Sequence, residues 1–447
     1  MNSSYDLLVI GAGSGGYAPA MECAKEGRRV ALVESGYFGG TCPVTGCNPK
    51  KVLVQAAEAV ERTRMISNAA LSGAVHIDWP RLIAFKRSFT DPIPKAREQS
   101  FKNAGVDTIH GRARFTGRNS VRVDDTEIQA EHIVISTGSK PRELRMDGAN
   151  LVTTSDQFME TTSLPGRVTF MGAGYISMEF AHVAAVAGAR VTVIGRGPRP
   201  LAGFDADLVD LLANGLRAAG ITILDNTEVE SITREADTLV VHCRADKSLD
   251  VETDMVVHGA GRVPNLDGLD LKRGSVEYGP KGVVVNEYLQ SVTNPAVYAC
   301  GDCADSGLPL SPVAEMESVI VAHNLKNGNT LTADYTATPY VVFTNPPLAG
   351  VGMTTETVKA SGRAFDEKFE DTSESVSSRR IGNRIAGYKV LTERDTGLIL
   401  GAHIIGPHAE EVINVFALAM RYGLKAGQLK RSIWAFPTSC SAVEEMV

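Results

Sequence analysis

The sequence predicts an α/β protein with two parallel-sheet domains followed by a C-terminal α+β domain. A strand, a glycine-rich turn, a helix and a second strand follow one another within residues 5–34, and the same order returns within residues 167–194. The tail, residues 340–447, instead carries several strand-like segments and then two helical ones. Strands that alternate with helices are typical of parallel sheets, whereas separate runs of the two are typical of α+β domains.

Length and charge limit the classes of protein to which this chain can belong. A chain of 447 residues suggests about three domains, and its net charge of −7 gives no sign of a nucleic-acid or anionic membrane partner. No stretch is apolar enough over the length needed to span a bilayer. The first apolar run, Leu7 to Ile10, leads into a glycine-rich turn, which argues against a signal peptide. We therefore expect a cytoplasmic protein with no membrane or nucleic-acid partner.

Two strand–helix–strand units can be assigned from apolar periodicity. In the first, residues 5–10 form a largely apolar strand, residues 17–26 have helical spacing and residues 29–33 form the next strand. In the second, the strands are predicted over residues 167–171 and 190–194, with a helix between them. Each unit is about 30 residues long, which is the usual size of a βαβ motif.

The glycines of the first unit are spaced as in a dinucleotide-binding turn. Gly11 permits the tight turn, Gly13 lets the backbone approach a pyrophosphate, and Gly16 lets helix and strand pack closely. The helix N-terminus then faces the phosphates. Glu34, at the end of the next strand, can bind both hydroxyls of a ribose. The alternative is a glycine-rich turn with a purely structural role.

The second unit differs in its third glycine and in the charge at its strand end. Gly172 and Gly174 match the pattern, but Ser177 stands at the third position, where a small residue still permits close packing. Gly195–Arg196 stands at the strand end in place of an acidic residue, and Arg199 lies three residues on. Arginines favour a 2′-phosphate, so this site is predicted to prefer NADPH. The alternative is a solvated basic turn.

The remaining elements follow from the same patterns. Helices are predicted over residues 55–64, 93–103, 311–326, 410–422 and 426–432. Strands are predicted between residues 107 and 135, over 221–229, 238–243, 254–261, 340–343, 388–393 and 398–406, and at the start of VYACGDCAD.

Two of the seven cysteines, Cys42 and Cys47, lie close together in the stretch GGTCPVTGCNPKK. In a reducing compartment a close pair is more often catalytic or metal-binding than structural. At about 100° per residue the two side chains do not share a helix face, so a disulfide needs a distorted turn, which Pro43 and Gly46 favour. A strained, exposed disulfide exchanges readily, and a lysine such as Lys50 favours thiolates. A zinc site is the alternative, although C-x4-C is not a usual ligand spacing.

These features together resemble the class I flavoprotein disulfide reductases, which include glutathione reductase, dihydrolipoamide dehydrogenase and mercuric reductase. The resemblance rests on two βαβ units, GGTCxxxGCxPKK, TGSKPR, GRVPN and AxGD, and it covers essentially the whole chain. It implies a glutathione reductase-like fold with two Rossmann-like nucleotide-binding domains, FAD and NADPH as cofactors, and a homodimer whose sites are shared across the interface. The implied domains are FAD-binding over 1–150, NAD(P)H-binding over 151–265, central over 266–335 and dimerisation over 336–447.

The resemblance also implies roles for individual residues. Cys47 is the sulfur against the flavin, Cys42 is the sulfur that meets a small-molecule substrate, and Lys50 pairs with Glu179 beside the flavin ring. Tyr175 covers the nicotinamide pocket. The implied FAD residues are Gly11, Gly13, Gly16, Glu34, Gly40, Thr41, Lys50, Ala113, Thr137, Gly138 and Asp302, and the implied nicotinamide-nucleotide residues are Gly172, Gly174, Tyr175, Ile176, Glu179, Arg196, Arg199 and Gly261. No resident metal is expected.

The C-terminus departs from the pattern of this family. Disulfide reductases carry a histidine there, which moves a thiol proton at the partner's site, and a glutamate that orients it. Phe436 stands at the histidine position and Ser441 at the glutamate position, while Pro437 and Thr438 remain. Phenylalanine carries no proton, so disulfide interchange is expected to be slow by about 10²–10⁴-fold. In this respect the chain resembles the 2-ketopropyl coenzyme M carboxylase branch of the family, in which a phenylalanine at the position of Phe436 excludes protons. We expect the Phe436–Pro437 peptide to be cis.

Other cysteines and histidines leave alternatives open. Cys440 is either a third redox thiol or a small core residue, and Cys300 and Cys303 either form a second redox pair or pack beside the flavin motif. His403 and His408 are expected to be interface or surface groups. In glutathione reductase an arginine on the first helix binds a substrate carboxylate; the matching position here carries methionine, which argues against glutathione.

Three functions remain open at this point. The first is an NADPH-dependent FAD oxidoreductase that passes electrons through the Cys42–Cys47 disulfide to a disulfide, metal ion or other acceptor, without the usual histidine. The second is a carboxylase-like enzyme in which the Cys42 thiolate attacks a thioether and Phe436 excludes protons. The third is a non-catalytic flavoprotein that senses NADPH or serves as a scaffold.

Overall fold

In the computed structural model, residues 3–67 and 70–447 are described, and they form two compact units. Each unit is assembled from three separate stretches of the chain. The first unit comprises Met1–Lys50, Ala84–Arg142 and Gly261–Tyr335, and the second comprises Lys51–Ile83, Glu143–Ala260 and Thr336–Val447. The four-domain division expected from the sequence cuts the chain differently and stays a prediction.

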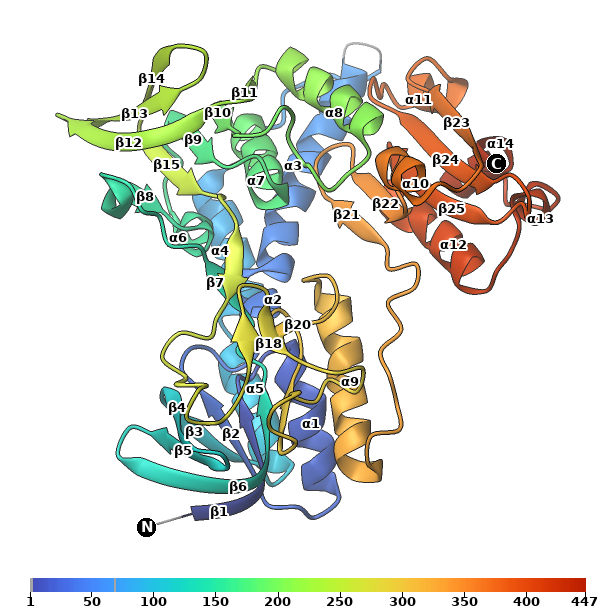
Figure 1. Ribbon diagram of the computed structural model, residues 1–447. Coiled ribbons are helices and arrows are strands. Elements are labelled where there is room, and N and C mark those ends of the chain that lie inside the picture. Colours follow the sequence, from blue (N-terminus) through green and yellow to red (C-terminus); the bar gives the residue numbers. More distant parts are fainter. Residues whose placement is uncertain (1–2, 68–69) are drawn as a thin grey trace. The chain divides into compact units, whose positions relative to one another are not determined.

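A seven-stranded sheet forms the centre of the first unit (Figure 1). Its N-terminal strands and a strand from late in the chain pair in parallel, and a short antiparallel ribbon extends one edge. The strand order is β3 (Asp107–His110), β2 (Val30–Glu34), β1 (Ser3–Ile10), β6 (Thr126–Ile135), β5 (Ser120–Val123), β4 (Ala113–Gly117), with β19 (Val297–Ala299) also on β6. The sheet confirms the predicted N-terminal βαβ unit.

Two helices of this unit that are far apart in the sequence lie side by side (Figure 1). They are α1 (Ser14–Lys25), which follows the first glycine-rich turn, and α9 (Ser311–Asn327). Ser318 Oγ accepts a hydrogen bond from the Ala18 amide at 3.1 Å, and the Arg28 guanidinium donates to Leu325 O at 3.1 Å. These contacts set where the N-terminus of α9 lies relative to the glycine-rich turn.

The second unit contains a five-stranded parallel sheet, as the second βαβ unit predicted. Its strand order is β11 (Thr222–Leu224), β10 (Arg190–Ile194), β9 (Arg167–Met171), β15 (Met255–His258), β8 (Val152–Thr153). Buried faces of α3 (Cys47–Ser67), α7 (Tyr175–Val186) and α8 (Ala206–Ala218) form one apolar core with this sheet. The sequence analysis did not predict α8, nor α4 (Trp79–Thr90).

The C-terminal segment of the second unit forms a five-stranded antiparallel sheet. Helix α12 (Ala409–Arg421) packs on this sheet, and the sheet and helix share an apolar core. The strand order is β21 (Tyr340–Val342), β22 (Leu348–Gly352), β25 (Ile399–Ile405), β24 (Gly387–Glu393), β23 (Phe365–Asp371). This arrangement confirms the predicted α+β C-terminal region, with β22 and β23 as strands that the sequence did not reveal.

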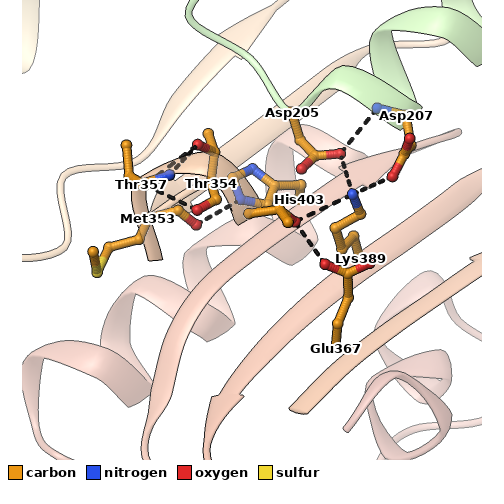
Figure 2. A network of polar contacts seen from close by, with 9 residues as sticks. Asp205, Asp207, Met353, Thr354, Thr357, Glu367, Lys389 and His403 are labelled. Atoms are coloured by element: carbon orange, nitrogen blue, oxygen red, sulfur yellow. Dashed lines mark hydrogen bonds and ion pairs between the residues drawn. The ribbon is translucent and has the colours of Figure 1, made fainter. Parts of the chain in front are cut away.

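A buried ion-pair network ties the start of α8 to the C-terminal sheet (Figure 2). Lys389 on β24 is only 2% exposed, and its Nζ lies 3.0 Å from Asp205 Oδ1 and also contacts Asp207. Asp205 caps α8 by accepting a hydrogen bond from the Asp207 amide at 3.2 Å. Burial alone would lower the pKa of Lys389, but these two carboxylates raise it, so the side chain stays charged.

His403 lies in the same region but is buried, which corrects the expectation of an interface or surface group. Its Nε2 donates a hydrogen bond to Met353 O at 3.0 Å, and burial lowers its pKa, so the ring is neutral (Figure 2). His408, by contrast, is exposed at the N-terminus of α12. His403 is therefore a packing residue of β25.

The Lys389 network predicts a large loss of stability on removal of the lysine charge. Lys389→Met should lower the free energy of unfolding by about 3–5 kcal/mol, because it leaves the Asp205 carboxylate buried without its cation. The double variant Lys389→Met with Asp205→Asn should recover most of that loss. Lys359→Met, at an exposed position of α10 (Thr355–Ser361), should change stability by no more than about 0.5 kcal/mol. Urea unfolding of the three variants measures the differences, and a Lys389→Met protein as stable as the control contradicts the prediction.

Candidate functional site

The two cysteines of GGTCPVTGC lie on either side of a break between helices. Cys42 belongs to the short helix α2 (Thr41–Thr45), and Cys47 is the first residue of α3. Gly46 separates the two helices, and a Cβ there would lie 2.7 Å from Thr41 O. Only glycine therefore lets the chain fold back closely enough to bring the two cysteines together. The distorted turn expected from the sequence is present.

The two cysteines lie next to each other and are not joined by a disulfide bond in this structure. All seven cysteines, which lie within the described part of the chain, are free thiols. Cys42 is half-buried, Cys47 is exposed, and their side chains are in hydrogen-bond contact. This contact with Cys47, followed by burial, holds the pKa of Cys42 well above its ordinary value. The Ser311 hydroxyl at the start of α9 acts in the opposite direction, and its Oγ lies 3.5 Å from Cys47 Sγ.

The first glycine-rich turn forms a cradle next to this pair. Helix α1 begins after Gly13, which has no side chain to accept hydrogen bonds from the first-turn amides. No capping side chain therefore competes with a phosphate at this end of the helix. Gly40 has φ of 70°, and a Cβ there would lie 2.6 Å from Gly13 Cα. The backbone before the cysteine helix thus crosses directly over the phosphate-facing turn.

Glu34 is held in the orientation that a ribose requires. Its Oε2 accepts a hydrogen bond from the Ala12 amide at 2.8 Å, and its Oε1 accepts one from the Gly36 amide at 2.7 Å. Each carboxylate oxygen keeps a free lone pair for a ribose hydroxyl. The structure therefore fits the role that the sequence assigned to Glu34.

Residues from two distant stretches hold the loop that follows β6. Asn265 donates its backbone N–H to Gly138 O at 2.8 Å. Arg262 Nε donates to Ser139 Oγ at 3.0 Å, and Ser139 in turn donates to Asp302 Oδ2 at 2.7 Å. GRVPN was noticed in the sequence, but its structural role in orienting Asp302 was not. Ser139 and Arg262 are therefore site residues that the sequence analysis missed.

Cys300 and Cys303 are buried beside this site, and their thiols contact backbone carbonyls. Cys300 Sγ donates to Gly15 O at 3.1 Å, and Cys303 Sγ donates to Ile135 O at 3.3 Å. Burial raises the pKa of both thiols, to about 11 for Cys303. Buried, protonated thiols are poor nucleophiles, so the structure favours the packing interpretation over a second redox pair.

The second glycine-rich turn repeats the cradle with one compensating change. Helix α7 begins after Gly174, so its first-turn amides likewise have no side-chain cap. Ser177 is fully buried, and a Cβ on Gly259 would lie 1.8 Å from Ser177 Oγ. A glycine on the facing segment therefore makes room for the serine at the third position. Arg196 and Arg199 follow β10, and the Arg196 side chain is 78% exposed.

Glu179, on α7, is the centre of a polar cluster in the second unit. It is 1% exposed, its Oε2 lies 2.8 Å from Lys51 Nζ, and its Oε1 accepts a hydrogen bond from the Phe343 amide at 2.9 Å. Lys51 Nζ also lies 3.9 Å from the centre of the Phe343 ring. The resemblance assigned no role to Lys51 or Phe343. The expected pair between Lys50 and Glu179 joins residues of different units and stays a prediction.

The other expected cofactor residues lie on several different elements. Lys50 is buried in the first turn of α3, and Tyr175 is exposed at the first residue of α7. Ala113 is buried at the start of β4, and Ile176 packs on the core of the second unit. Gly261 accepts a hydrogen bond from the Arg142 amide at 3.0 Å.

Phe436 lies in the second unit, near the C-terminus, and its side chain is 86% exposed. The Phe436–Pro437 peptide is cis, as predicted. Ser441 donates a hydrogen bond to Thr438 O at 2.6 Å, and Cys440 is half-buried against the apolar core of the C-terminal sheet. The packing of Cys440 fits a small core residue. The expected approach of Phe436 to the cysteine pair of a second subunit stays a prediction.

The described residues include neither a membrane-spanning helix nor a cluster of metal-binding side chains. None of their helices combines the length and apolarity needed to cross a membrane. Within residues 3–67 and 70–447, no three His, Cys, Asp or Glu side chains gather as a metal site would require.

Comparison with known proteins places these features in a family. Residues 5–322 match the pyridine nucleotide-disulphide oxidoreductase family, and residues 338–447 match its dimerisation domain. The chain is 31% identical to glutathione reductase of Burkholderia cepacia, over 97% of this chain and 96% of the relative. It is 31% identical to dihydrolipoyl dehydrogenase of Mycobacterium leprae, over 99% of this chain and 97% of the relative. It is 28% identical to mercuric reductase of Bacillus cereus, over 99% of this chain and 71% of that relative.

A solved structure has the same fold. The Cu(II) complex of the HOCl-induced flavoprotein disulfide reductase RclA from Escherichia coli superimposes with a TM-score of 0.89 at 28% identity, and the match covers 100% of this chain and 99% of that one. The relatives are reductases and dehydrogenases that use FAD and NAD(P)H. The chain is therefore a member of the pyridine nucleotide-disulphide oxidoreductase family, an FAD-dependent flavoprotein of the disulfide reductase class.

Proposed function

We propose that the protein is an NADPH-dependent flavoprotein reductase that passes electrons through the Cys42–Cys47 pair to a disulfide, metal ion or other small acceptor. The observation that supports this most directly is the contact between the two thiols at the break between α2 and α3. In the balanced reaction, NADPH, one proton and the Cys42–Cys47 disulfide give NADP⁺ and two thiols. The thiols then reduce the acceptor and return to the disulfide.

The residues of the first unit fit FAD. The uncapped turn after Gly13 suits a pyrophosphate, and Glu34 is oriented for ribose hydroxyls by two backbone amides. Bound flavin supplies the two-electron transfer between the nicotinamide and the cysteine pair. Cys47, as the first residue of α3, keeps its sulfur at the positive end of the helix, which favours the thiolate.

Preference for NADPH is proposed from the charge of the loop after β10. Arg196 is largely exposed, and its guanidinium is 3.9 Å from Glu228, too far for a strong hydrogen bond. Arg199 is similarly placed, 4.0 Å from Asp210. Both guanidinium groups are therefore free to turn toward a 2′-phosphate, which accepts charge-assisted hydrogen bonds from arginine.

The acceptor is proposed to be one whose reduction does not need a histidine acid. Phe436 cannot exchange a proton. An acceptor whose reduction releases a group that must be protonated would therefore react slowly. Metal ions need no proton, and the similar solved structure of RclA is a Cu(II) complex. Met21 stands where glutathione reductase carries a substrate-binding arginine, which argues against glutathione.

A second candidate function rests on Phe436 alone. A phenyl ring in place of the histidine suits a site that excludes protons, as in a carboxylase that uses the Cys42 thiolate on a thioether. The same residue thus supports either a reductase of acceptors that need no proton or carbon–carbon bond chemistry, and turnover of coenzyme M thioethers in the presence of CO₂ distinguishes the two.

Assembly as a homodimer is proposed from the match to the dimerisation domain. Exposed apolar side chains on and after α12, among them Tyr422, Ile433 and Phe436, would then be covered by the partner. Sedimentation that shows a fully active monomer at assay concentration would exclude shared sites.

Substitution of each cysteine in turn should distinguish the sulfur next to the flavin from the sulfur that reacts with the acceptor. Reduced holoenzyme should show long-wavelength absorbance from a Cys47 thiolate next to the flavin, which Cys47→Ser should lose and Cys42→Ser should keep. Both variants should lose more than about 99% of acceptor reduction, because each removes one sulfur of the pair. Cys243→Ala, at a buried cysteine far from the site in sequence, should retain activity. Stopped-flow spectra with NADPH and a screen of disulfides, Hg(II), Cu(II) and quinones test this, and full activity of Cys42→Ser would contradict the proposal.

Reversal of charge at Arg196 should alter the choice of nucleotide. Arg196→Glu should reduce the ratio of kcat/KM for NADPH to kcat/KM for NADH by roughly ten- to hundredfold, because a charge-assisted bond to phosphate is replaced by repulsion. Arg190→Glu provides the matched control, since Arg190 is exposed at the opposite end of β10. Steady-state rates with both nucleotides measure the ratio. A wild type with equal efficiency for NADPH and NADH would remove the basis of the proposal.

Restoration of the missing acid should reveal what limits disulfide turnover. Phe436→His with Ser441→Glu should raise the rate with a simple disulfide by at least roughly 10²-fold, because general acid–base catalysis contributes about 10²–10⁴-fold. Phe436→Leu, which removes the ring without adding an acid, should give no gain. Rates with glutathione disulfide and lipoamide provide the measurement. If the wild type already reduces either at the rate of ordinary disulfide reductases, another group supplies the proton.

A further inference from the structure

The hydroxyl of Ser311 lies against both thiols of the cysteine pair. Its Oγ is 3.5 Å from Cys47 Sγ, a hydrogen-bond distance for sulfur, and a side-chain hydrogen bond from Ser311 lowers the pKa of Cys42. The two thiols interact with each other as well. A hydroxyl carries one proton and two acceptor lone pairs, so it can donate to one sulfur while it accepts from the other.

We propose that Ser311 is a catalytic residue that relays a proton between Cys42 and Cys47. In the relay, Ser311 gives its hydroxyl proton to the Cys47 thiolate and takes the proton of the Cys42 thiol. Cys42–SH with Cys47–S⁻ thereby becomes Cys42–S⁻ with Cys47–SH, without any change in total charge or oxidation state. This inference rests on the proposed function, since it assigns a role within the same cysteine pair.

The relay meets a need that the C-terminal sequence creates. Cys42 must be a thiolate to attack an acceptor, because the thiolate is the nucleophile. In the family a histidine takes that proton, but Phe436 stands at its position. With Ser311 in contact with both sulfurs, the proton of Cys42 can pass to Cys47 and need not leave the pair.

Helix α9 presents two groups with opposite effects on Cys42. Contact with Cys47 and burial raise the pKa of Cys42, the Ser311 hydrogen bond lowers it, and the charge of Glu315 raises it. Glu315 follows Ser311 by one helical turn on the same face of α9, and its Oε1 accepts a hydrogen bond from Ser14 Oγ at 3.4 Å. Lys50, in the first turn of α3, is a positively charged residue three positions after Cys47 in the sequence. Removal of the Ser311 hydroxyl and removal of the Glu315 carboxylate should therefore shift the pKa of Cys42 in opposite directions.

The test measures the reactivity of Cys42 in chemically reduced, FAD-loaded protein. The pair is reduced with dithiothreitol, freed of reductant without oxygen, and alkylated with iodoacetamide at a series of pH values, with peptide mapping to identify the labelled cysteine. Ser311→Ala should slow labelling of Cys42 at pH 7 by about tenfold and move the rate–pH profile up by about one unit. Ser311→Thr, which keeps the hydroxyl, should stay within about twofold of wild type. Glu315→Gln should speed labelling by roughly threefold.

Several outcomes would overturn the relay. A Ser311→Ala profile that superimposes on wild type would show that the hydroxyl does not act on the pair. Failure of Ser311→Thr to restore the profile, at normal FAD content and melting temperature, would show a packing effect and not a hydroxyl effect. Slower labelling in Glu315→Gln would point to a general disturbance of α9.

This test is separate from the test of the proposed function, because it uses neither NADPH nor an acceptor. A wild-type protein in which Cys42 reacts no faster than Cys440 would count against the cysteine pair as the working site. Normal wild-type labelling with an unaffected Ser311→Ala variant would count against the relay alone.

Discussion

The close approach of two backbone turns governs the geometry of the site. The turn that starts α1 and the turn that starts the cysteine helix pass so close at Gly13 and Gly40 that a Cβ on Gly40 would lie 2.6 Å from Gly13 Cα. Side chains cannot be inserted there, so the spacing between the phosphate-facing amides and the cysteine pair is set by backbone alone. Gly46 is a second position at which a side chain cannot fit, because a Cβ there would lie too close to Thr41 O. This glycine stands at the break between the helices that carry the two cysteines. A cofactor held by the first turn is thereby kept in a fixed relation to both sulfurs.

The part of helix α3 that belongs to the second unit packs against α7. Beyond Cys47 it makes three polar contacts with α7: Lys51 with Glu179 at 2.8 Å, Glu61 with His182 at 2.9 Å, and Arg64 with Val186 O at 3.2 Å. His182 is buried, and its contact lowers the pKa of Glu61 against the opposing effect of burial. Pairs of this kind are costly to break because one buried charge would be left alone. The register of α3 against the helix that follows the second glycine-rich turn is therefore strongly specified.

Two pairs of cysteines in the first unit show how environment separates chemistry from packing. Cys300 and Cys303 are fully buried, donate to backbone carbonyls and have raised pKa values, so they behave as small apolar residues. Cys42 also has a raised pKa, but its causes include a second thiol, and a hydroxyl opposes them. Cys47 is exposed at a helix N-terminus. Burial dominates the surroundings of Cys300 and Cys303, whereas hydrogen-bonding groups and access to solvent also act on the Cys42–Cys47 pair.

The sequence alone determined the features that depend on near neighbours in the chain. Both βαβ units and the break around Gly46 follow from local sequence patterns, as does the prediction of phosphate and ribose contacts at Gly11, Gly13 and Glu34. The tertiary structure decided the features that join distant stretches. Ser311 meets Cys47 across 264 positions, Gly259 makes room for Ser177, and Lys389 pairs with Asp205 on another element. His403, expected near the surface, is buried because β25 is an inner strand of its sheet. A periodic sequence pattern shows which face of a helix or strand is apolar. It does not show which polar side chain of another element contacts a given residue, and such a contact sets that residue's pKa and chemistry.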